Sequence, residues 1–202
     1  MSKRWWIAAL LATATAINYL DRQNLPVAIS EIQKTIPISD TQYSQLQFLF
    51  LLAYGAMYAV GGRLLDLLGT RWGYALMIVW WSAANALHGL AGTVTQLGAV
   101  RFALGLGEGG GFPGSAKAVA EWFAVEERAF AFGLFNSGSS VGAVIAPPLI
   151  AAIVTSLGWR WVFLITGALG FAWAAVWATV YHADREFRGE GRTANKVGRI
   201  AA

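Results

Sequence analysis

Four charged side chains interrupt stretches of this 202-residue sequence that are otherwise apolar: Asp21, Arg22, Arg101 and Glu108. The apolar run over residues 5–20 has sixteen residues. As a helix it covers only about 24 Å of the ~30 Å hydrocarbon core of a bilayer. A membrane-spanning helix must therefore continue through Asp21 and Arg22. Each charge there costs about 2.5–3.5 kcal/mol or more unless it meets a partner or a wet cavity, so a use for this pair is expected.

Arg101 and Glu108 are seven residues apart, which is about two helical turns, so they project from one face about 10 Å apart. With Asp21 and Arg22 they make two acids and two bases that balance. Two structural ion pairs between helices are one interpretation. The other is a carboxyl group that takes up a proton beside a cation that binds an anion. An apolar site favours a protonated carboxyl group and a neighbouring cation favours an ionised one, which is a physical basis for proton-coupled symport.

The composition predicts a membrane protein for the whole chain. Apolar residues make up 56% and charged residues 13%, the mean hydropathy is +0.50, and a soluble domain has about 25% charged residues. Many of the ten Trp residues lie near the expected ends of spans. A signal peptide is excluded because the first apolar run is too long and no cleavage site precedes a soluble domain. The absence of Cys excludes disulfides and thiolate chemistry.

Six apolar segments predict an all-α, polytopic membrane protein with six transmembrane helices. The segments are 5–30, 43–65, 72–91, 97–120, 129–154 and 161–182. We expect a six-helix transmembrane domain over 1–183 and a basic tail over 184–202. The fourth and fifth segments concentrate Gly and Pro, which suits helices that bend or slide, although a static bundle can use them as well.

The basic residues of the short loops predict the orientation. With a cytoplasmic N-terminus, eleven basic residues lie on the cytoplasmic side: Lys3, Arg4, Arg63, Arg71, Lys117, Arg128, Arg185, Arg188, Arg192, Lys196 and Arg199. Only Lys34 and Arg160 lie on the opposite side. Both termini are therefore expected in the cytoplasm. The net charge of +4 reflects this topology, and no nucleic-acid partner is needed to explain it.

A glycine-flanked string lies at the turn between the second and third segments, from Gly62 to Arg71. Asp66 at a helix end can pair with Arg71 or face the positive end of a neighbouring helix, and Gly62 and Gly69 permit a tight turn and close packing. A simple helix hairpin could also look like this. The string resembles the loop signature Gly-x-Leu-x-Asp-x-x-Gly-x-Arg of the major facilitator superfamily, with Leu67 where a basic residue is frequent. Residues 101–108 resemble that superfamily's fourth-helix Arg-x-x-x-Gly motif.

Three further stretches resemble the anion–cation symporter family, with its hexuronate and galactonate branch closest. They are Asn18-Tyr19-Leu20-Asp21-Arg22, Glu121-Trp122-Phe123 with Glu127-Arg128-Ala129, and Phe135-Asn136-Ser137-Gly138. Members of that family carry hexuronates, aldonates and related organic anions, usually with protons. The resemblance covers residues 5–182. It implies one half of a twelve-helix transporter, built as a three-plus-three inverted repeat, with the basic tail as the start of the linker between halves.

The resemblance also implies roles for individual residues. Proton coupling falls to Asp21, Glu108 and Arg101, with Arg101 paired to Asp21. The resemblance assigns substrate binding to Arg22, which contacts a carboxylate, and to Tyr19, Tyr54, Asn136 and Ser139. Some sugar-acid transporters have Gln where this chain has Ser139, which leaves the sugar acid open. A conformational latch falls to Gly62, Asp66, Gly69 and Arg71.

The sequence thus predicts proton-coupled symport of organic anions such as hexuronates across a bacterial inner membrane, with this chain as the N-terminal half. A C-terminal half is expected as a missing segment or a separate chain, and a homodimer is a further alternative. Sodium remains open as the coupling ion. A non-transporting membrane subunit or an inert fragment is the alternative function. No enzyme, cofactor or metal site is expected, because His88 and His182 are isolated and no HExxH motif occurs.

Overall fold

The computed structural model describes residues 3–181, and the expected tail over 184–202 lies outside the described residues. Within the described part the chain forms seven helices and no strand. They are α1 (Lys3–Gln33), α2 (Asp40–Leu68), α3 (Thr70–His88), α4 (Val94–Glu108), α5 (Gly111–Trp122), α6 (Val125–Leu157) and α7 (Trp159–Val180). By length and composition, α2, α6 and α7 are apolar enough to cross a membrane.

The fourth predicted segment differs from the structure. One span was expected over 97–120, with Gly and Pro residues that suit a bending helix, and in the structure α4 ends at Glu108 and α5 starts at Gly111. A Cβ atom on Gly109 would collide with the backbone of Tyr54, and one on Gly107 would lie 2.6 Å from Cβ of Trp81. The glycines therefore let this segment press against α2 and α3, and the helix breaks where it does so. The break directly follows Glu108.

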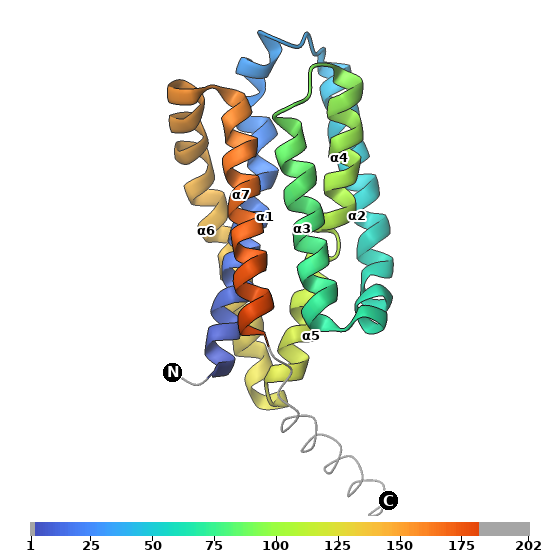
Figure 1. The fold of residues 1–202 in the computed structure, drawn as a ribbon, viewed down its shortest axis with the longest axis vertical. Coiled ribbons are helices and arrows are strands. Elements are labelled where there is room, and N and C mark those ends of the chain that lie inside the picture. Colours follow the sequence, from blue (N-terminus) through green and yellow to red (C-terminus); the bar gives the residue numbers. More distant parts are fainter. Residues whose placement is uncertain (1–2, 182–202) are drawn as a thin grey trace, which may run out of the picture.

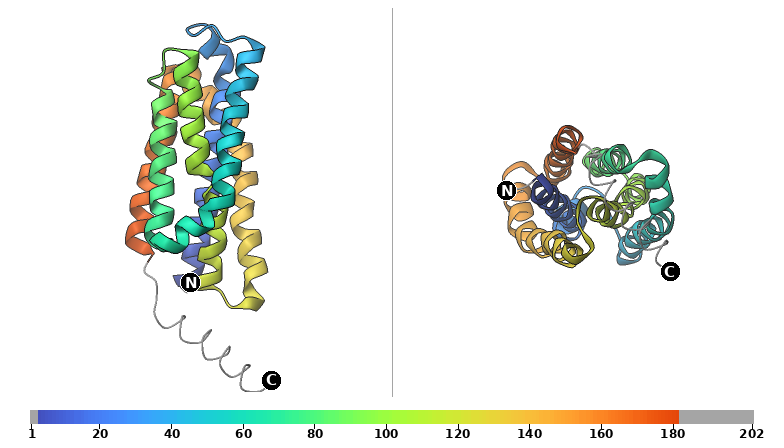
Figure 2. Two further views of the ribbon diagram at one scale, coloured as in Figure 1. Left: turned by 90° about the vertical axis from the view of Figure 1, so that its right-hand side faces the viewer. Right: turned by 90° about the horizontal axis from the view of Figure 1, so that it is seen from below.

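The helices run side by side along the long axis of an elongated bundle (Figure 1). Seen along that axis, α1, α6 and α7 form one group and α2, α3 and α4 form a second, which meet mainly where α3 packs on α7 (Figure 2). The start of α1, the α2–α3 turn, the α5–α6 link and the end of α7 all lie at one end (Figure 1). We call this the N-terminal end. It holds Arg4, Arg71 and Arg128, which are near the starts of α1, α3 and α6.

Close helix contacts depend on small residues. On α6, a Cβ atom at Gly138 would collide with the carbonyl group of Ala12 on α1, and one at Gly142 would collide with that of Ala16. Small residues at such positions let helices in a membrane approach closely. Two tight turns use glycines with positive φ, Gly69 at 76° and Gly158 at 93°. The contacts of Gly138 and Gly142 set the distance of α6 from α1, the helix that carries Asp21 and Arg22.

Candidate functional site

An ion pair joins α1 to the end of α4 in the middle of the bundle. Nε of Arg22 donates to Oε2 of Glu108 at 2.8 Å. The Glu108 side chain is completely buried, whereas the Arg22 side chain keeps 26% exposure. The helix break after Glu108 lets this carboxylate sit at a helix end, facing α1. The pair that the charges form here is thus Arg22 with Glu108.

Aromatic rings surround the Arg22 guanidinium. Its Cζ atom lies 4.6 Å from the ring centre of Tyr54, 5.1 Å from that of Tyr19 and 5.8 Å from that of Phe50. Cations this close to ring faces are attracted by them, and more strongly when water is excluded. The rings therefore hold a partly desolvated cation in place without neutralising it, which is a suitable arrangement for an anion-binding group.

A cavity of about 70 Å³ borders this cation. Its polar lining residues come from α1, α2, α3, α4, α5 and α6: Thr15, Asn18, Tyr19, Arg22, Tyr54, Tyr74, Glu108, Ser115 and Asn136. The volume has room for a few water molecules and is well below the ~300–1,000 Å³ of a typical ligand pocket. Asn136 is thus placed at the site, whereas the exposed Ser139 hydroxyl donates to the backbone carbonyl of Asn136 at 2.6 Å and does not line the cavity.

Asp21 belongs to a separate buried cluster that connects α1, α3 and α7. Its Oδ1 accepts from Nδ2 of Asn85 at 2.8 Å and from Nδ2 of Asn24 at 3.5 Å. Both asparagines also donate to the hydroxyl of Thr166, at 2.8 and 2.6 Å. Sequence reasoning missed Asn24, Asn85 and Thr166. The available signal was an amide inside an apolar span, because such groups need partners there.

The pair expected between Asp21 and Arg101 is not formed, since no ion pair joins them among the described residues. Arg101 is buried with its Cζ 5.7 Å from the ring centre of Phe50. Its Nε and Nη2 have no hydrogen-bond partner within residues 3–181, nor do Oδ2 of Asp21 and Oε1 of Glu108. An unpartnered buried polar atom costs about 1–3 kcal/mol. These charged groups can therefore form further hydrogen bonds or ion pairs.

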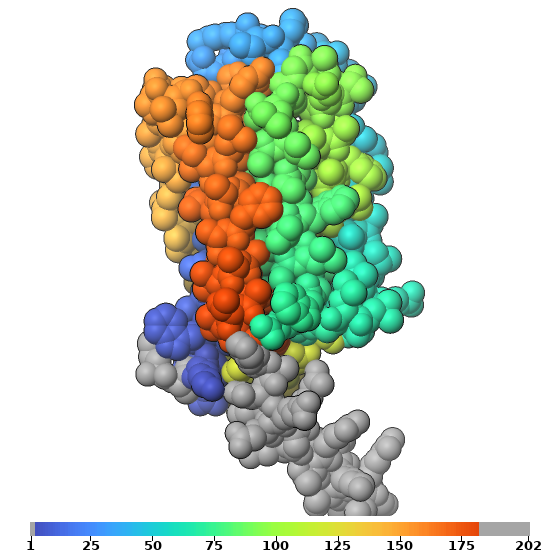
Figure 3. Space-filling view, viewed as in Figure 1, coloured from blue at the N-terminus to red at the C-terminus, as the bar shows by residue number. Residues whose placement is uncertain are grey.

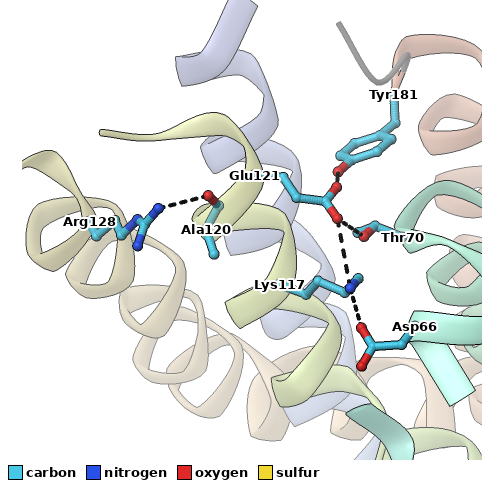
Figure 4. Close-up of polar contacts among 7 residues, drawn as sticks. All are labelled: Asp66, Thr70, Lys117, Ala120, Glu121, Arg128 and Tyr181. Carbon is cyan, nitrogen blue, oxygen red and sulfur yellow. Dashed lines mark hydrogen bonds and ion pairs between the residues drawn. The ribbon is translucent and has the colours of Figure 1, made fainter. Parts of the chain in front are cut away.

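A second polar network ties helices together at the N-terminal end (Figure 4). Asp66 at the end of α2 pairs with Lys117 of α5. One residue, Glu121 of α5, accepts from the Thr70 hydroxyl at 2.7 Å and from the Tyr181 hydroxyl at 2.6 Å. Lys117 lies 3.9 Å from the same carboxylate. We call these five residues the end network.

Of the two alternatives for Asp66, the pair with Arg71 is not formed among the described residues. Asp66 takes Lys117 instead, and Nε of Arg71 donates to the backbone carbonyl of Ala178 at 3.1 Å. Because α3 packs on α7, Arg71 in the first turn of α3 points to α7. Of the two glycines, Gly69 needs its positive φ, but a Cβ atom on Gly62 would meet nothing within 4 Å inside the described part of the chain.

His88 has a packing role. Its ring stacks on Phe163 with centres 5.1 Å apart, and its Nδ1 lies 2.8 Å from the carbonyl oxygen of Ala84. Within the described residues no cluster of three or more His, Cys, Asp or Glu side chains could hold a metal ion.

Comparisons with known proteins give the family. The model of the Major Facilitator Superfamily matches residues 11–200. The hexuronate transporter of Escherichia coli strain K12 is 39% identical over 183 residues, which are 91% of this chain and 42% of that protein. The galacturonate transporter of Dickeya chrysanthemi is 38% identical over 178 residues, 88% of this chain and 52% of that protein. The chain thus spans about half the length of these relatives.

A solved structure shows the same fold. A bacterial homolog of the human lysosomal transporter Spinster, crystallised in an inward-facing and occupied conformation, matches with a TM-score of 0.77 at 22% identity. The match covers 91% of this chain and 45% of that one. Sequence and fold agree on a multi-pass membrane protein whose relatives are transporters and not enzymes. The chain therefore belongs to the Major Facilitator Superfamily.

Proposed function

We propose that this chain supplies the N-terminal half of a proton-coupled symporter for organic anions such as hexuronates. The observation that carries the proposal is Arg22, a partly exposed cation held between two tyrosine rings and a buried carboxylate at the edge of a cavity. Two relatives are a hexuronate transporter and a galacturonate transporter, which supports this substrate class. We place the protein in a bacterial inner membrane with both termini in the cytoplasm, from its basic residues.

In this proposal Arg22 binds the substrate carboxylate. A guanidinium can form two parallel hydrogen bonds with a carboxylate. Arg22 uses only its Nε to bind Glu108. Tyr19 and Tyr54 keep the guanidinium in place, and Asn136 offers a polar contact from α6. Ser139 joins the substrate site only if α6 turns or slides, because it lies outside the cavity.

Proton coupling follows from competition for Arg22. When an anion draws the guanidinium away, Glu108 becomes a buried carboxylate without its ion-pair partner, which is costly. A proton on Glu108 removes that cost, so anion binding and proton uptake favour each other. Asp21 is the second proton site, and Arg101 is the cation that can exchange between the two carboxylates.

The end network acts as the latch in this proposal, together with Gly62, Gly69 and Arg71. It joins α2, α3, α5 and the end of α7 on the proposed cytoplasmic side. The small cavity of the described residues supports a site completed by further helices. We propose a C-terminal six-helix half for that role, either in the same polypeptide or as a second chain.

The experiment is uptake by the chain joined to, or co-expressed with, the C-terminal half of the Escherichia coli hexuronate transporter. Vesicles receive labelled glucuronate or galacturonate under an imposed proton gradient or an imposed sodium gradient. We expect uptake that follows the proton gradient and is abolished in Asp21→Asn and Glu108→Gln. The control Glu31→Gln changes an exposed carboxylate paired with Lys34 and should leave uptake unchanged.

Undiminished and still pH-dependent uptake in both variants would overturn the proton-site assignments. Uptake driven by sodium alone would replace the proton as coupling ion. A chain that inserts stably but gives no uptake with any C-terminal half would favour the non-transporting alternative.

A further inference from the structure

An apolar groove runs along the outer seam between α3 and α7. Its volume is about 540 Å³, and Figure 3 shows the face on which these two helices lie side by side. Its walls are large side chains from the two helices: Trp72, Leu76 and Val79 of α3, and Phe171 of α7. Its remaining surface on α7 is formed by Ala174, Ala175 and Ala178, whose small side chains leave the space open.

The groove and the central cavity use opposite faces of α3. Tyr74 and Trp81 line the cavity and are buried. Trp72, Leu76 and Val79 line the groove and are exposed. In a membrane protein an exposed apolar surface of this kind faces lipid. The site where substrate and a second half would meet therefore lies elsewhere on the molecule.

The groove is short enough to lie within one leaflet of a bilayer. On α3 the lining residues extend from Trp72 to Val79, and Leu68 lines the groove from the end of α2. Those seven steps along α3 of about 1.5 Å cover roughly 10 Å, which is about a third of the ~30 Å hydrocarbon core. A second membrane-spanning helix needs about 20 residues to cross the whole core and would extend well past the groove. One acyl chain of one leaflet fits the dimension better.

A cation stands at the end of the groove where a lipid headgroup would lie. Cζ of Arg71 is 4.8 Å from the ring centre of Trp72, and its Nε and Nη2 donate to the carbonyl oxygen of Ala178. Both of those neighbours line the groove. Among the described residues Arg71 forms no ion pair, because the nearby acids are taken by Lys117, Thr70 and Tyr181. Trp residues also favour the headgroup level.

We propose that this groove binds one acyl chain of an anionic phospholipid, whose phosphate pairs with the remaining N–H groups of Arg71. Arginine forms strong, directional hydrogen bonds with phosphate oxygens, and its anchoring on Ala178 pre-orients the guanidinium. The occupied groove clamps α3 to α7 next to the end network. This inference does not depend on which solute the family member transports.

The test uses the purified full chain in detergent with phospholipids that carry brominated acyl chains. Bromine quenches nearby Trp fluorescence, and Trp72 lies on the groove wall. We expect phosphatidylglycerol to bind about tenfold more tightly than phosphatidylcholine, which is about 1.4 kcal/mol. Arg71→Gln should reduce that preference to below about twofold while phosphatidylcholine still binds. Ala175→Phe should fill the groove and weaken both lipids.

Arg160→Gln is the matched control. Arg160 also lies on a Trp ring, 4.2 Å from that of Trp159, and donates to the carbonyl of Ala91, but it sits at the other end of the bundle. It should leave the lipid preference unchanged. Ala175→Leu serves as a milder groove variant, and circular dichroism checks that each variant is folded. Equal affinity for the two lipids, a preference that survives Arg71→Gln, or displacement of lipid by a second copy would each overturn the proposal.

Discussion

The central charged residues and the end network differ in how deeply their charged groups are buried and in how many of their polar atoms have partners. In the centre, Asp21, Arg101 and Glu108 are fully buried, and each has at least one polar atom without a partner within the described chain. At the end, Asp66 is 68% exposed and Lys117 is 28% exposed. Glu121 there has a hydroxyl donor for each oxygen.

This contrast teaches which charges can change partners. A fully satisfied network loses hydrogen bonds when it moves, so the end network is suited to holding helices in one arrangement. The central groups already lack partners, so a shift of Arg22 or Arg101 exchanges one incomplete arrangement for another. Burial makes each exchange energetically large, whereas water moderates any change at the exposed end.

The largest expected effect comes from removing one member of the central pair. Arg22→Gln leaves Glu108 buried without its cation, and breaking a buried pair costs about 3–5 kcal/mol. Glu108→Gln should cost less, because Arg22 is partly exposed and keeps its aromatic neighbours. The free energy of unfolding in detergent, measured by denaturant titration, checks this order.

The double variant Arg22→Gln with Glu108→Gln sharpens the same test. It removes both charges, so much of the stability lost in Arg22→Gln should return, while uptake in the assay above stays absent. An equal loss of stability in the single and the double variant would show that the buried charge is not the cause.

The second effect concerns how α1 is seated against α6. A Cβ atom on Gly138 would lie 2.9 Å from the carbonyl carbon of Ala12, whereas Gly133 on the same helix has open space. Overpacking costs about 1–3 kcal/mol, so Gly138→Ala should lower the melting temperature. Gly133→Ala should be neutral or slightly stabilising, because Ala favours a helix over Gly. Similar losses in both variants would contradict close packing as the reason.

The presence of the helices could be predicted from the sequence, but the ion-pair partners of the charged side chains could not. Long apolar runs give helices at all six predicted segments, because each run is long enough for a helix and is bounded by turns. The Gly and Pro residues of the fourth segment indicated a bend, but the position of the break after Glu108 was not predicted, since a Gly-rich helix and a broken one have the same hydropathy. Arg22 and Glu108 were both predicted as site residues. Their pairing was not, because the distance between two helices depends on packing that no local pattern records.

The residues predicted for the latch show the same limit of sequence-based prediction. Asp66 and Arg71 are five residues apart, and proximity in sequence made a pair one of two alternatives. Because of the turn at Gly69, with φ of 76°, and the packing of α3 on α7, the Arg71 side chain contacts Ala178 of α7. Lys117, fifty-one residues away from Asp66, takes its place. Long-range contacts of this kind, like those of Asn85 and Thr166, become visible only once the helices are arranged.

A smaller effect is expected at Tyr181, which ties the end of α7 to α5. Tyr181→Phe removes the hydroxyl that donates to Glu121 at 2.6 Å but keeps the ring stacked on Trp177. The loss of one hydrogen bond to a charged group should cost about 1.5–3 kcal/mol at most, and less here because Thr70 and Lys117 still contact Glu121. Denaturant titration gives the free energy of unfolding. No change at all would mean that Glu121 finds a replacement donor.

The smallest effect should come from the Asp66–Lys117 pair, and it gives the cleanest measure of the contrast. Because Asp66 is mostly exposed, a double-mutant cycle with Asp66→Asn and Lys117→Gln should give a coupling of about 0.2–1 kcal/mol. That coupling should shrink as salt rises, since exposed charges are screened. The same cycle on Arg22 and Glu108 should give a larger coupling that salt hardly changes. If the two cycles gave equal couplings, exposure would not separate the exchangeable charges from the fixed ones, and the assignment of proton coupling to the centre would lose its physical ground.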